Sequence, residues 1–274
     1  MSLKGRIKNY AKKNNIAAQV VLQNYMFERF LERLSKSEYS NTFVIKGGVL
    51  VASIVGLDIR SPMDLDTTIR NLPLSKKKVL ETIHSICDID LHDDTKFVVN
   101  SISPIRKDDI YGGYCVKLNA IYESIVTPLS IDVSTGDVIT PSAIMYNFEG
   151  IFDQDLSISL WGYNIETVLA EKVETILRRG SFNTRLRDFY DVYILCTTQK
   201  YDRNTFKKAL EATSNHRESI HLISDSNKIL DELSQNTELK AMCIKYQNKY
   251  PYASNVSYES IMNILNDLMS GNNT

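Results

Sequence analysis

The 274-residue sequence predicts an α+β fold, in which a mixed β-sheet with flanking helices is followed by a helical C-terminal domain. Two observations predict this fold class. Before residue 155, short apolar and β-branched segments end at turn residues, which is typical of strands. After that point, apolar residues recur at helical spacing. We therefore expect an α/β domain with N-terminal helices at 1–155 and a helical domain at 156–274.

Most elements of the first domain can be assigned from their own patterns. Helices are expected at 16–37 and at 75–87, the second with Ser75 as its N-cap. A strand at 42–46 stops at Gly47-Gly48, and a short helix follows at 49–55. Further strands are expected at 63–69, 96–102, 113–122 and 128–133.

The second domain is assigned from a series of amphipathic patterns. Helices are expected at 164–180, 184–196, 203–213 and 258–269. No linker rich in proline or serine separates the two domains, so the boundary rests on the change of pattern alone.

Composition and cysteine usage exclude several protein classes. The chain is 43% hydrophobic, with a formal net charge of −1, so it has a core but no overall basic field for nucleic acid. Its four cysteines form no CxxC pair, which is typical of a reducing compartment. No signal peptide is evident, and no apolar run reaches the ~18–20 residues of a membrane span. We expect a cytoplasmic protein without a membrane partner.

Charged residues outside the main motif receive ordinary interpretations. Residues 1–40 contain eight Lys and Arg against three Glu, so a basic patch is compatible with the neutral total. Asp93 and Asp94 are expected in a solvated loop, and the four scattered histidines show no ligand spacing. The Tyr- and Lys-rich segment 245–258 either serves packing and the surface or stacks on RNA bases.

Asp64 and Asp66 flank Leu65 within an apolar segment. In a strand, residues i and i+2 project from the same face, so the two carboxylates are expected side by side. Adjacent carboxylates repel unless a cation neutralises them, and a hard divalent ion does this well. The ordinary alternative is a solvated sheet edge.

A possible phosphate site lies just upstream, at Gly47 and Gly48. Glycines at the start of a helix leave backbone N–H groups free to hold a phosphate. Further along, Asp132 either faces solvent or, if its strand lies beside the Asp64–Asp66 strand, joins that pair. Three carboxylates can hold two metal ions roughly 3.5–4 Å apart, one activating a hydroxyl and one binding the leaving phosphates.

Together these motifs resemble those of a known family. Lys46-Gly47-Gly48, then Gly56, Arg60 and the Asp-Leu-Asp at 64–66 resemble the signature of the DNA-polymerase-β-type nucleotidyltransferase superfamily. More narrowly, with the flanking segments 24–48 and 170–195, the chain resembles the AbiEii/AbiGii toxins of bacterial phage-defence (abortive infection) toxin–antitoxin systems. The likeness covers about residues 1–200 and implies a nucleotidyltransferase-type mixed sheet.

This sequence departs from the family pattern at two positions. Val49 stands where the superfamily has a hydroxyl residue after the glycines, so backbone N–H groups alone remain to bind phosphate there. Pro62 stands where the family often has Ser or Thr, which removes any role for a hydroxyl at that position.

In the helix at 164–180, Lys172 falls within the apolar stripe and Arg179 lies at its edge one heptad later. Lys172 either extends its ammonium to solvent or directs it at a triphosphate in a cleft between the domains. The family resemblance implies the second role, with Arg179 also on the nucleotide.

In the helix at 184–196, Arg187, Asp188 and Asp191 form a narrow polar wedge away from the apolar face. An i,i+4 surface pair of Arg187 with Asp191 would explain it. The resemblance instead implies that Asp188 belongs to the active site and orients Lys172 or the nucleotide, with Asp191 a weaker candidate.

The leading hypothesis is a nucleotidyltransferase that moves a nucleoside monophosphate from an NTP to an acceptor. Asp64, Asp66 and Asp132 would bind two Mg²⁺ ions, Gly47 and Gly48 the phosphates, and Lys172 the transition-state charge. The resemblance implies an RNA acceptor, the tRNA 3′ end, and a separately encoded antitoxin that need not touch this protein. The alternatives are a catalytically degenerate nucleotide- or RNA-binding protein and a two-metal nuclease.

Overall fold

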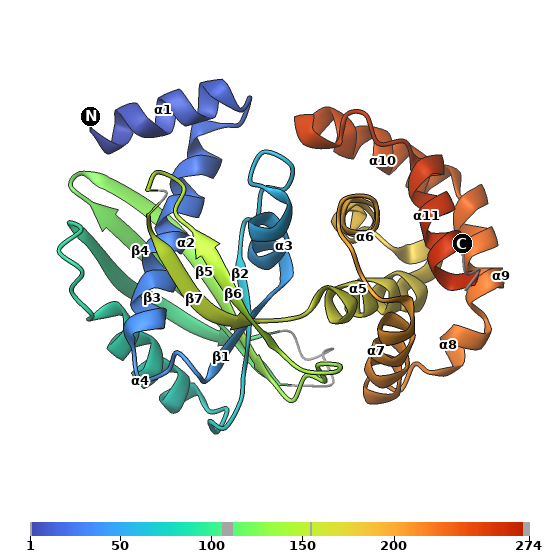
Figure 1. Ribbon diagram of the computed structural model, residues 1–274, viewed down its shortest axis with the longest axis horizontal. Coiled ribbons are helices and arrows are strands. Elements are labelled where there is room, and N and C mark those ends of the chain that lie inside the picture. The colour runs from blue at the N-terminus through green and yellow to red at the C-terminus, as the bar shows by residue number, and fades with distance from the viewer. Residues whose placement is uncertain (1, 106–111, 154, 271–274) are drawn as a thin grey trace. The chain divides into compact units, whose positions relative to one another are not determined.

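The computed structural model describes residues 2–105, 112–153 and 155–270. The chain divides into two compact units. The first contains Met1–Asp137 and Ala143–Tyr163, and the second contains Val138–Ser142 and Asn164–Thr274. A mixed sheet with helices forms the first unit, and helices joined by loops form the second, so the predicted fold class is confirmed (Figure 1).

The sheet of the first unit has seven strands among the described residues, in the order β3-β4-β5-β2-β1-β7-β6. Parallel pairs join β2 to β5 and β1 to β7, and the remaining neighbours are antiparallel. In chain order the strands are β1 (Phe43–Lys46), β2 (Leu65–Ile69), β3 (Thr95–Pro104), β4 (Gly113–Tyr122), β5 (Ile125–Thr135), β6 (Ile144–Glu149) and β7 (Ser157–Gly162).

Four helices belong to the first unit within the described residues. They are α1 (Leu3–Lys13), α2 (Ala18–Lys36), α3 (Gly47–Val55) and α4 (Lys76–Cys87). Helix α2 packs against β5 and β7, and α4 packs against β3, β4 and α2. Ser75 caps α4 as predicted, because its hydroxyl accepts a hydrogen bond from the N–H of Lys78 at 3.2 Å.

Strands β6 and β7 differ from the sequence-based expectation. No strand was expected at either position, and residues 157–162 were assigned to the helical domain. Instead β7 pairs with both β6 and β1, and the division between the units falls at Tyr163/Asn164 rather than at 155/156. Strand β7 does alternate, with Ile158 and Leu160 buried between exposed Ser157 and Ser159, so period-two spacing was available there but was not used. Strand β6 exposes four of its six residues and shows no such alternation.

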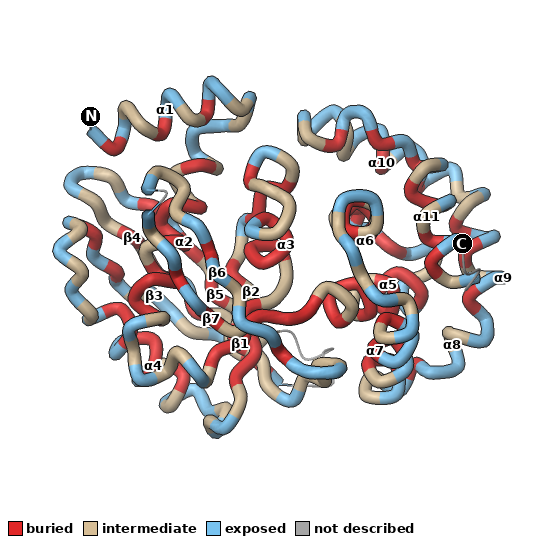
Figure 2. The backbone as a smooth tube through the Cα atoms, viewed as in Figure 1, coloured by how far each residue is buried: buried red, intermediate tan, exposed pale blue. Residues whose placement is uncertain are grey.

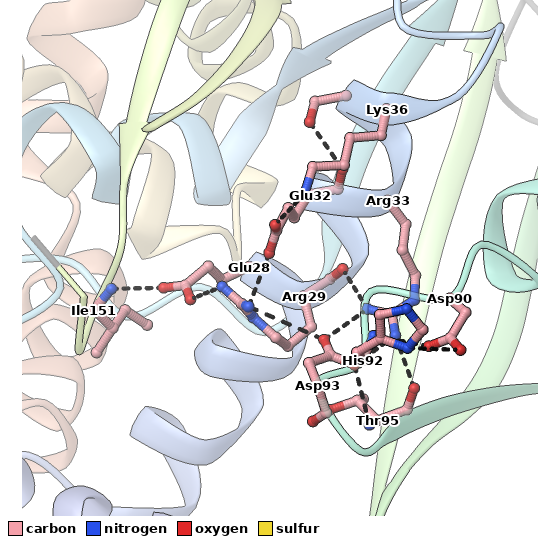
Figure 3. Close-up of polar contacts among 11 residues, drawn as sticks. Glu28, Arg29, Glu32, Arg33, Lys36, Asp90, His92, Asp93, Thr95 and Ile151 are labelled. Carbon is pink, nitrogen blue, oxygen red and sulfur yellow. Dashed lines mark hydrogen bonds and ion pairs between the residues drawn. The ribbon is translucent and has the colours of Figure 1, made fainter. Parts of the chain in front are cut away.

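A charged cluster ties α2 to two loops of the first unit; its members are Glu28, Arg29, Glu32, Arg33 and Asp93 (Figure 3). Arg33 binds the Asp93 carboxylate with both terminal nitrogens, at 2.9 and 2.7 Å, and also donates to the carbonyl of Thr95 at 2.8 Å. Glu28 accepts a 2.6 Å hydrogen bond from the N–H of Ile151.

This cluster overturns two sequence-based interpretations. Asp93 was expected in a solvated loop, yet its side chain is only 12% exposed because Arg33 binds it from a helix 60 residues away in the chain. Arg29 and Arg33, which contribute to the basic excess of residues 1–40, are neutralised by carboxylates and add nothing to a basic patch. Asp94 is exposed, as expected.

The second unit is helical throughout its regular structure. It contains α5 (Ile165–Arg179), η1 (Gly180–Phe182), α6 (Leu186–Thr198), α7 (Arg203–His216), α8 (His221–Ser224), α9 (Ser226–Gln235), α10 (Thr237–Lys249), η2 (Pro251–Ala253) and α11 (Tyr258–Ser270). Helix α5 packs against α6 and α7 and is mostly buried (Figure 2). Among the described residues, no helix combines the length and the apolar character that a bilayer crossing requires.

Candidate functional site

Five polar side chains form one row across the sheet of the first unit, with Ser103 opposite Cys115 at its outer end. The strand register places Cys115 opposite Asp132, Asp132 opposite Asp66, and Asp66 opposite Lys46. Directly paired residues project from the same face of a sheet, so these side chains lie on one face. The flanking row Val116–Ile131–Leu65 projects from the other face and is fully buried. The sequence left the place of Asp132 open, and the register resolves it: its strand lies beside that of Asp66.

Asp66 also lies against the glycine turn. A Cβ atom added at Gly47 would be 2.0 Å from Asp66 Oδ2, and the φ angle of Gly47 is +65°. A side chain at position 47 would therefore collide with the carboxylate and strain the backbone. Gly47 is also the first residue of α3, so the Asp66 carboxylate meets the start of a helix whose first N–H groups have no partner within the helix.

Gly48 is buried, and its space is limited by different neighbours from those of Gly47. A Cβ atom at this position would be 3.3 Å from both Pro62 Cβ and Arg60 Nη2. Arg60 is itself 3% exposed and donates a 3.0 Å hydrogen bond to the carbonyl of Ser61. Pro62, a departure from the family pattern, thus packs directly on the glycine turn. Val49, the other departure, is buried in α3.

Asp64 lies outside the strand ladder, in the bend immediately before β2, and is half-buried. Its side chain is therefore not held by strand pairing as those of Asp66 and Asp132 are. Within 2–105, 112–153 and 155–270, no three His, Cys, Asp or Glu side chains are close enough together to hold a metal ion. The donor atoms nevertheless suit Mg²⁺, because all three candidates offer carboxylate oxygens and two of them are paired across adjacent strands.

Lys46 and Asp137 form an ion pair that the sequence did not suggest. Lys46 Nζ is 2.6 Å from Asp137 Oδ2, which also accepts a hydrogen bond from the Ser134 hydroxyl at 2.9 Å. Burial alone raises the pKa of Asp137, but the Lys46 ammonium and these hydrogen bonds outweigh it, so the net pKa is lowered. This ion pair joins Lys46, the residue before the glycine turn, to the segment that follows β5.

Cys115 lies in the polar row between Asp132 and Ser103. Its Sγ atom is 3.1 Å from the hydroxyl of Ser130. Burial and a hydrogen bond with Asp132 raise the pKa of this thiol, so it is neutral near pH 7. It adds a neutral hydrogen-bonding group, not a further negative charge, to the row.

In the second unit, Lys172 of α5 joins both acidic residues of α6. Its Nζ atom is 3.1 Å from Asp188 Oδ1 and 2.7 Å from Asp191 Oδ2. The Lys172 side chain is 11% exposed, and those of Asp188 and Asp191 are 6% and 0% exposed. The alternative of an i,i+4 pair on the helix surface is therefore wrong, because Asp188 and Asp191 are buried against Lys172. Arg185 Nε adds a second positive charge 2.9 Å from Asp188 Oδ2.

Helix α5 is held firmly on a second side. Arg217, just beyond α7, pairs with Glu171 at 2.7 Å and with Glu174 at 2.6 Å. At the start of the helix, the Asn164 side chain accepts a hydrogen bond from the N–H of Thr167, as an N-cap does. Lys172 thus extends from a fixed helix. Arg179, the other candidate on α5, is its last helical residue and is exposed.

The predicted site residues therefore fall into two sets. Gly47, Gly48, Asp66 and Asp132 are brought together in the first unit, with Asp64 at the strand entrance. Lys172, Asp188 and Asp191 are brought together in the second unit, with Arg179 at the helix end. The sequence missed Lys46–Asp137, whose residues are 91 positions apart and share no local pattern.

Comparison with known proteins places this arrangement in context. The profile of the "Nucleotidyl transferase AbiEii toxin, Type IV TA system" family matches residues 29–257. Among the curated proteins none matches the chain.

Two solved structures from Helicobacter pylori share the fold. JHP933 is 15% identical to the chain with a TM-score of 0.50, and the match covers 93% of each chain. A candidate nucleotidyltransferase is also 15% identical, with a TM-score of 0.52, and the match covers 93% of this chain and 96% of that one.

Proposed function

The chain belongs to the AbiEii nucleotidyl transferase toxin family of type IV toxin–antitoxin systems, and on this premise we propose that it transfers a nucleoside monophosphate from an NTP to RNA. One observation carries the proposal. The carboxylate of Asp66 lies against Gly47 at the start of α3 and is paired with Asp132, so a place for phosphate adjoins a place for metal ions.

Each candidate site residue of the first unit has a proposed role in this reaction. Asp64, Asp66 and Asp132 would hold two Mg²⁺ ions, which supply charge neutralisation for the triphosphate and activation of the acceptor hydroxyl. The first N–H groups of α3, at Gly47 and Gly48, hold the β- and γ-phosphates without help from a hydroxyl at position 49. Asp132 assists removal of the proton from the acceptor hydroxyl.

In the second unit, Lys172 offsets negative charge that develops on the phosphates, and Arg179 assists nucleotide binding. Asp188 and Asp191 fix the Lys172 ammonium in position through their 3.1 and 2.7 Å contacts. The acceptor oxygen forms a bond to the α-phosphorus as the bond between that phosphorus and the bridging oxygen breaks. Pyrophosphate is the leaving group.

The acceptor we propose is the 3′ end of tRNA, whose modification stops translation and makes the protein toxic in the cytoplasm, as a phage-defence toxin requires. A separately encoded antitoxin with a DNA-binding domain is its proposed partner and need not contact it. The acceptor, the metal and the compartment come from the family resemblance and the chemistry of the residues.

The test is incorporation of labelled NTP into bulk tRNA, with and without Mg²⁺. We expect Mg²⁺-dependent extension, with Asp66→Asn reducing the rate at least about 100-fold. Asp94→Asn is the matched control, because Asp94 is exposed and has a φ of +56° that asparagine tolerates. Equal incorporation by wild type and Asp66→Asn would refute the proposed site.

A second candidate is a degenerate member that binds nucleotide or RNA without turnover. The buried Val49 beside the glycine turn favours it, because no hydroxyl is available there. Saturable NTP binding without incorporation for any of the four NTPs would establish this alternative. Shortening of the RNA instead of extension would identify a nuclease.

A further inference from the structure

Four tyrosines gather in the second unit: Tyr190 on α6, Tyr246 on α10, which packs against α6, and Tyr250 and Tyr252 just after α10. We name Tyr246, Tyr250 and Tyr252, with Tyr190 beneath them, the tyrosine platform. Ring centroids are 4.7 Å apart for Tyr246–Tyr250, 5.4 Å for the stacked pair Tyr250–Tyr252 and 5.1 Å for Tyr190–Tyr252. Tyr190 is 2% exposed, whereas the other three are half-buried.

The platform is fixed by hydrogen bonds as well as by ring contacts. The hydroxyls of Tyr246 and Tyr252 are 2.9 Å apart, and the Tyr190 hydroxyl donates to the carbonyl of Tyr252 at 3.3 Å. A partner that stacks on these rings would therefore lose little entropy in ordering them. Core packing explains Tyr190, but it does not explain three half-buried rings held in place.

Cations surround the platform. Lys245 and Lys249 are exposed and one helical turn apart on α10, and the Lys249 ammonium lies 5.3 Å from the centroid of the Tyr250 ring. Between Leu239 and Ser257 the sequence contains three lysines and no Asp or Glu. An anionic partner with flat apolar groups fits this combination.

Arg187 links the platform to α6, the helix whose aspartates bind Lys172. Burial alone raises the pKa of Tyr250, but a hydrogen bond from Arg187 and the positive charges of Arg187 and Lys249 lower it overall. Arg187 is the residue before Asp188 on α6, and Tyr190 lies one turn further along the same helix. Arg187 and Tyr190 thus join the platform to the helix that carries Asp188 and Asp191.

We propose that the tyrosine platform binds the single-stranded 3′ end of the acceptor RNA, whose bases stack on Tyr250 and its neighbours while Lys245, Lys249 and Arg187 contact the phosphates. Base–aromatic stacking together with a basic margin is how proteins bind single strands without reading a sequence. The proposal rests on the proposed function, because it assigns the acceptor of that reaction to a surface. It selects RNA over a peptide because no carboxylate in the 239–257 segment is available to receive a basic side chain.

Binding is tested apart from catalysis, in the Asp66→Asn protein, by fluorescence anisotropy of a labelled RNA strand of about eight nucleotides. Tyr250→Leu is expected to weaken binding about tenfold, the loss of one stacked base, and Tyr250→Phe to stay within about twofold because the ring remains. Lys249→Ala should lower the affinity and reduce the salt dependence by about one counterion. A blunt duplex should bind at least about tenfold more weakly than the strand.

Lys240→Ala is the matched control for Lys249→Ala. It is exposed on the same helix but nine residues earlier, about two and a half turns, and so faces the opposite side. Its affinity should equal that of the parent protein. Thermal unfolding of Tyr250→Leu must match that of Tyr250→Phe, so that a binding loss is not caused by misfolding.

The proposal is overturned if Tyr250→Leu binds as tightly as the parent, if Tyr250→Phe loses as much affinity as Tyr250→Leu, or if the duplex binds equally well. Steady-state kinetics distinguish RNA binding by the tyrosine platform from the proposed transfer reaction. In an otherwise wild-type protein, Tyr250→Leu should raise KM for RNA about tenfold with KM for NTP unchanged. If the protein with Asp66 intact binds RNA in a Tyr250-dependent manner but transfers no nucleotide from any of the four NTPs, the proposed function is refuted and the platform stands.

Discussion

The charged cluster on α2 and the Lys172 cluster on α5 and α6 solve the same problem with different side chains. Both bury carboxylates against cations from a neighbouring element. In the first unit the most buried cation is Arg33, whose side chain is 2% exposed and donates three hydrogen bonds to Asp93 and Thr95. In the second it is Lys172, whose ammonium bridges two aspartates on one helix.

The difference teaches what each cluster is suited to do. A guanidinium binds in a fixed planar fork and always carries its charge, so Arg33 can join a helix to a loop rigidly. An ammonium is a compact point charge that can exchange one oxygen partner for another. In the proposed reaction, Lys172 could therefore exchange an aspartate oxygen for a phosphate oxygen, whereas the fixed fork of Arg33 allows no such exchange.

The largest expected effect is on stability, from Arg33→Met. The substitution leaves Asp93 12% exposed without its main partner, and breaking a buried ion pair costs about 3–5 kcal/mol. Arg33→Lys should also destabilise, because an ammonium cannot bind Asp93 and Thr95 in the same fork. Urea unfolding followed by circular dichroism measures both, and a loss below about 1 kcal/mol for Arg33→Met would contradict a structural role.

Asp93 also shows why this cluster could not be predicted. The sequence around it contains loop-forming residues, and its solvated appearance is correct for Asp94 alone. Its partner lies on α2, and no local pattern reports a contact across 60 residues. Elements with strong periodicity were predictable. The ends of α5 and β4 fall within one residue of the expected bounds, because the apolar pattern of each lies within its own segment of sequence.

The next effect is on activity, from Lys172→Met. Removing the ammonium should lower the rate of transfer about 10²–10³-fold, as loss of one transition-state donor does. Lys172→Arg should not restore it, because the planar fork cannot occupy the same point between Asp188 and Asp191. Exposed Lys200→Met in the same unit is the control. Single-turnover transfer with saturating NTP is the measurement, and full activity of Lys172→Met would remove this cluster from the site.

Part of the site was predictable and part was not. The sequence predicted a strand that carries Asp132 but left open whether its carboxylate faces solvent, and only the pairing of β5 with β2 places it beside Asp66. Helical-wheel reasoning placed Asp188 and Asp191 outside the core, because it scores a carboxylate by its own polarity. Their burial depends on Lys172 from another helix, which only the tertiary structure supplies.

A smaller effect on the free energy of unfolding is expected at acidic pH. Individual carboxylates of the first unit contribute to it with opposite signs. Hydrogen bonds and charge from Arg33 outweigh the burial of Asp93, so its folded-state pKa lies below the ordinary 3.8. Such a group stabilises the fold above its unfolded pKa and loses that contribution as pH falls through its folded pKa. The pKa of Asp137 is also lowered, because the charge of Lys46 outweighs burial, so its contribution to stability is lost in the same direction. Stability should fall below about pH 4.

Glu28 opposes this trend. Burial raises its pKa above 4.5 despite the Ile151 N–H and Arg29, so its contribution is largest below the unfolded pKa and declines as pH rises through the folded one. Urea unfolding between pH 2 and pH 6 measures the sum. Asp93→Asn should flatten the acid limb, and Glu28→Gln should steepen it between about pH 4 and pH 6. Identical profiles for the two variants would contradict the opposite signs.

The smallest expected effect comes from Lys36, at the margin of the α2 cluster. Lys36 Nζ is only 2.7 Å from Glu32 Oε1, a shorter contact than either hydrogen bond from Arg33 Nη1, yet its side chain is 56% exposed. Water screens an exposed pair and its side-chain entropy opposes it, so Lys36→Ala should change stability by less than about 0.5 kcal/mol. Urea unfolding beside Arg33→Met gives the comparison on one helix. If the two losses were equal, burial would not be what distinguishes the cations of this cluster.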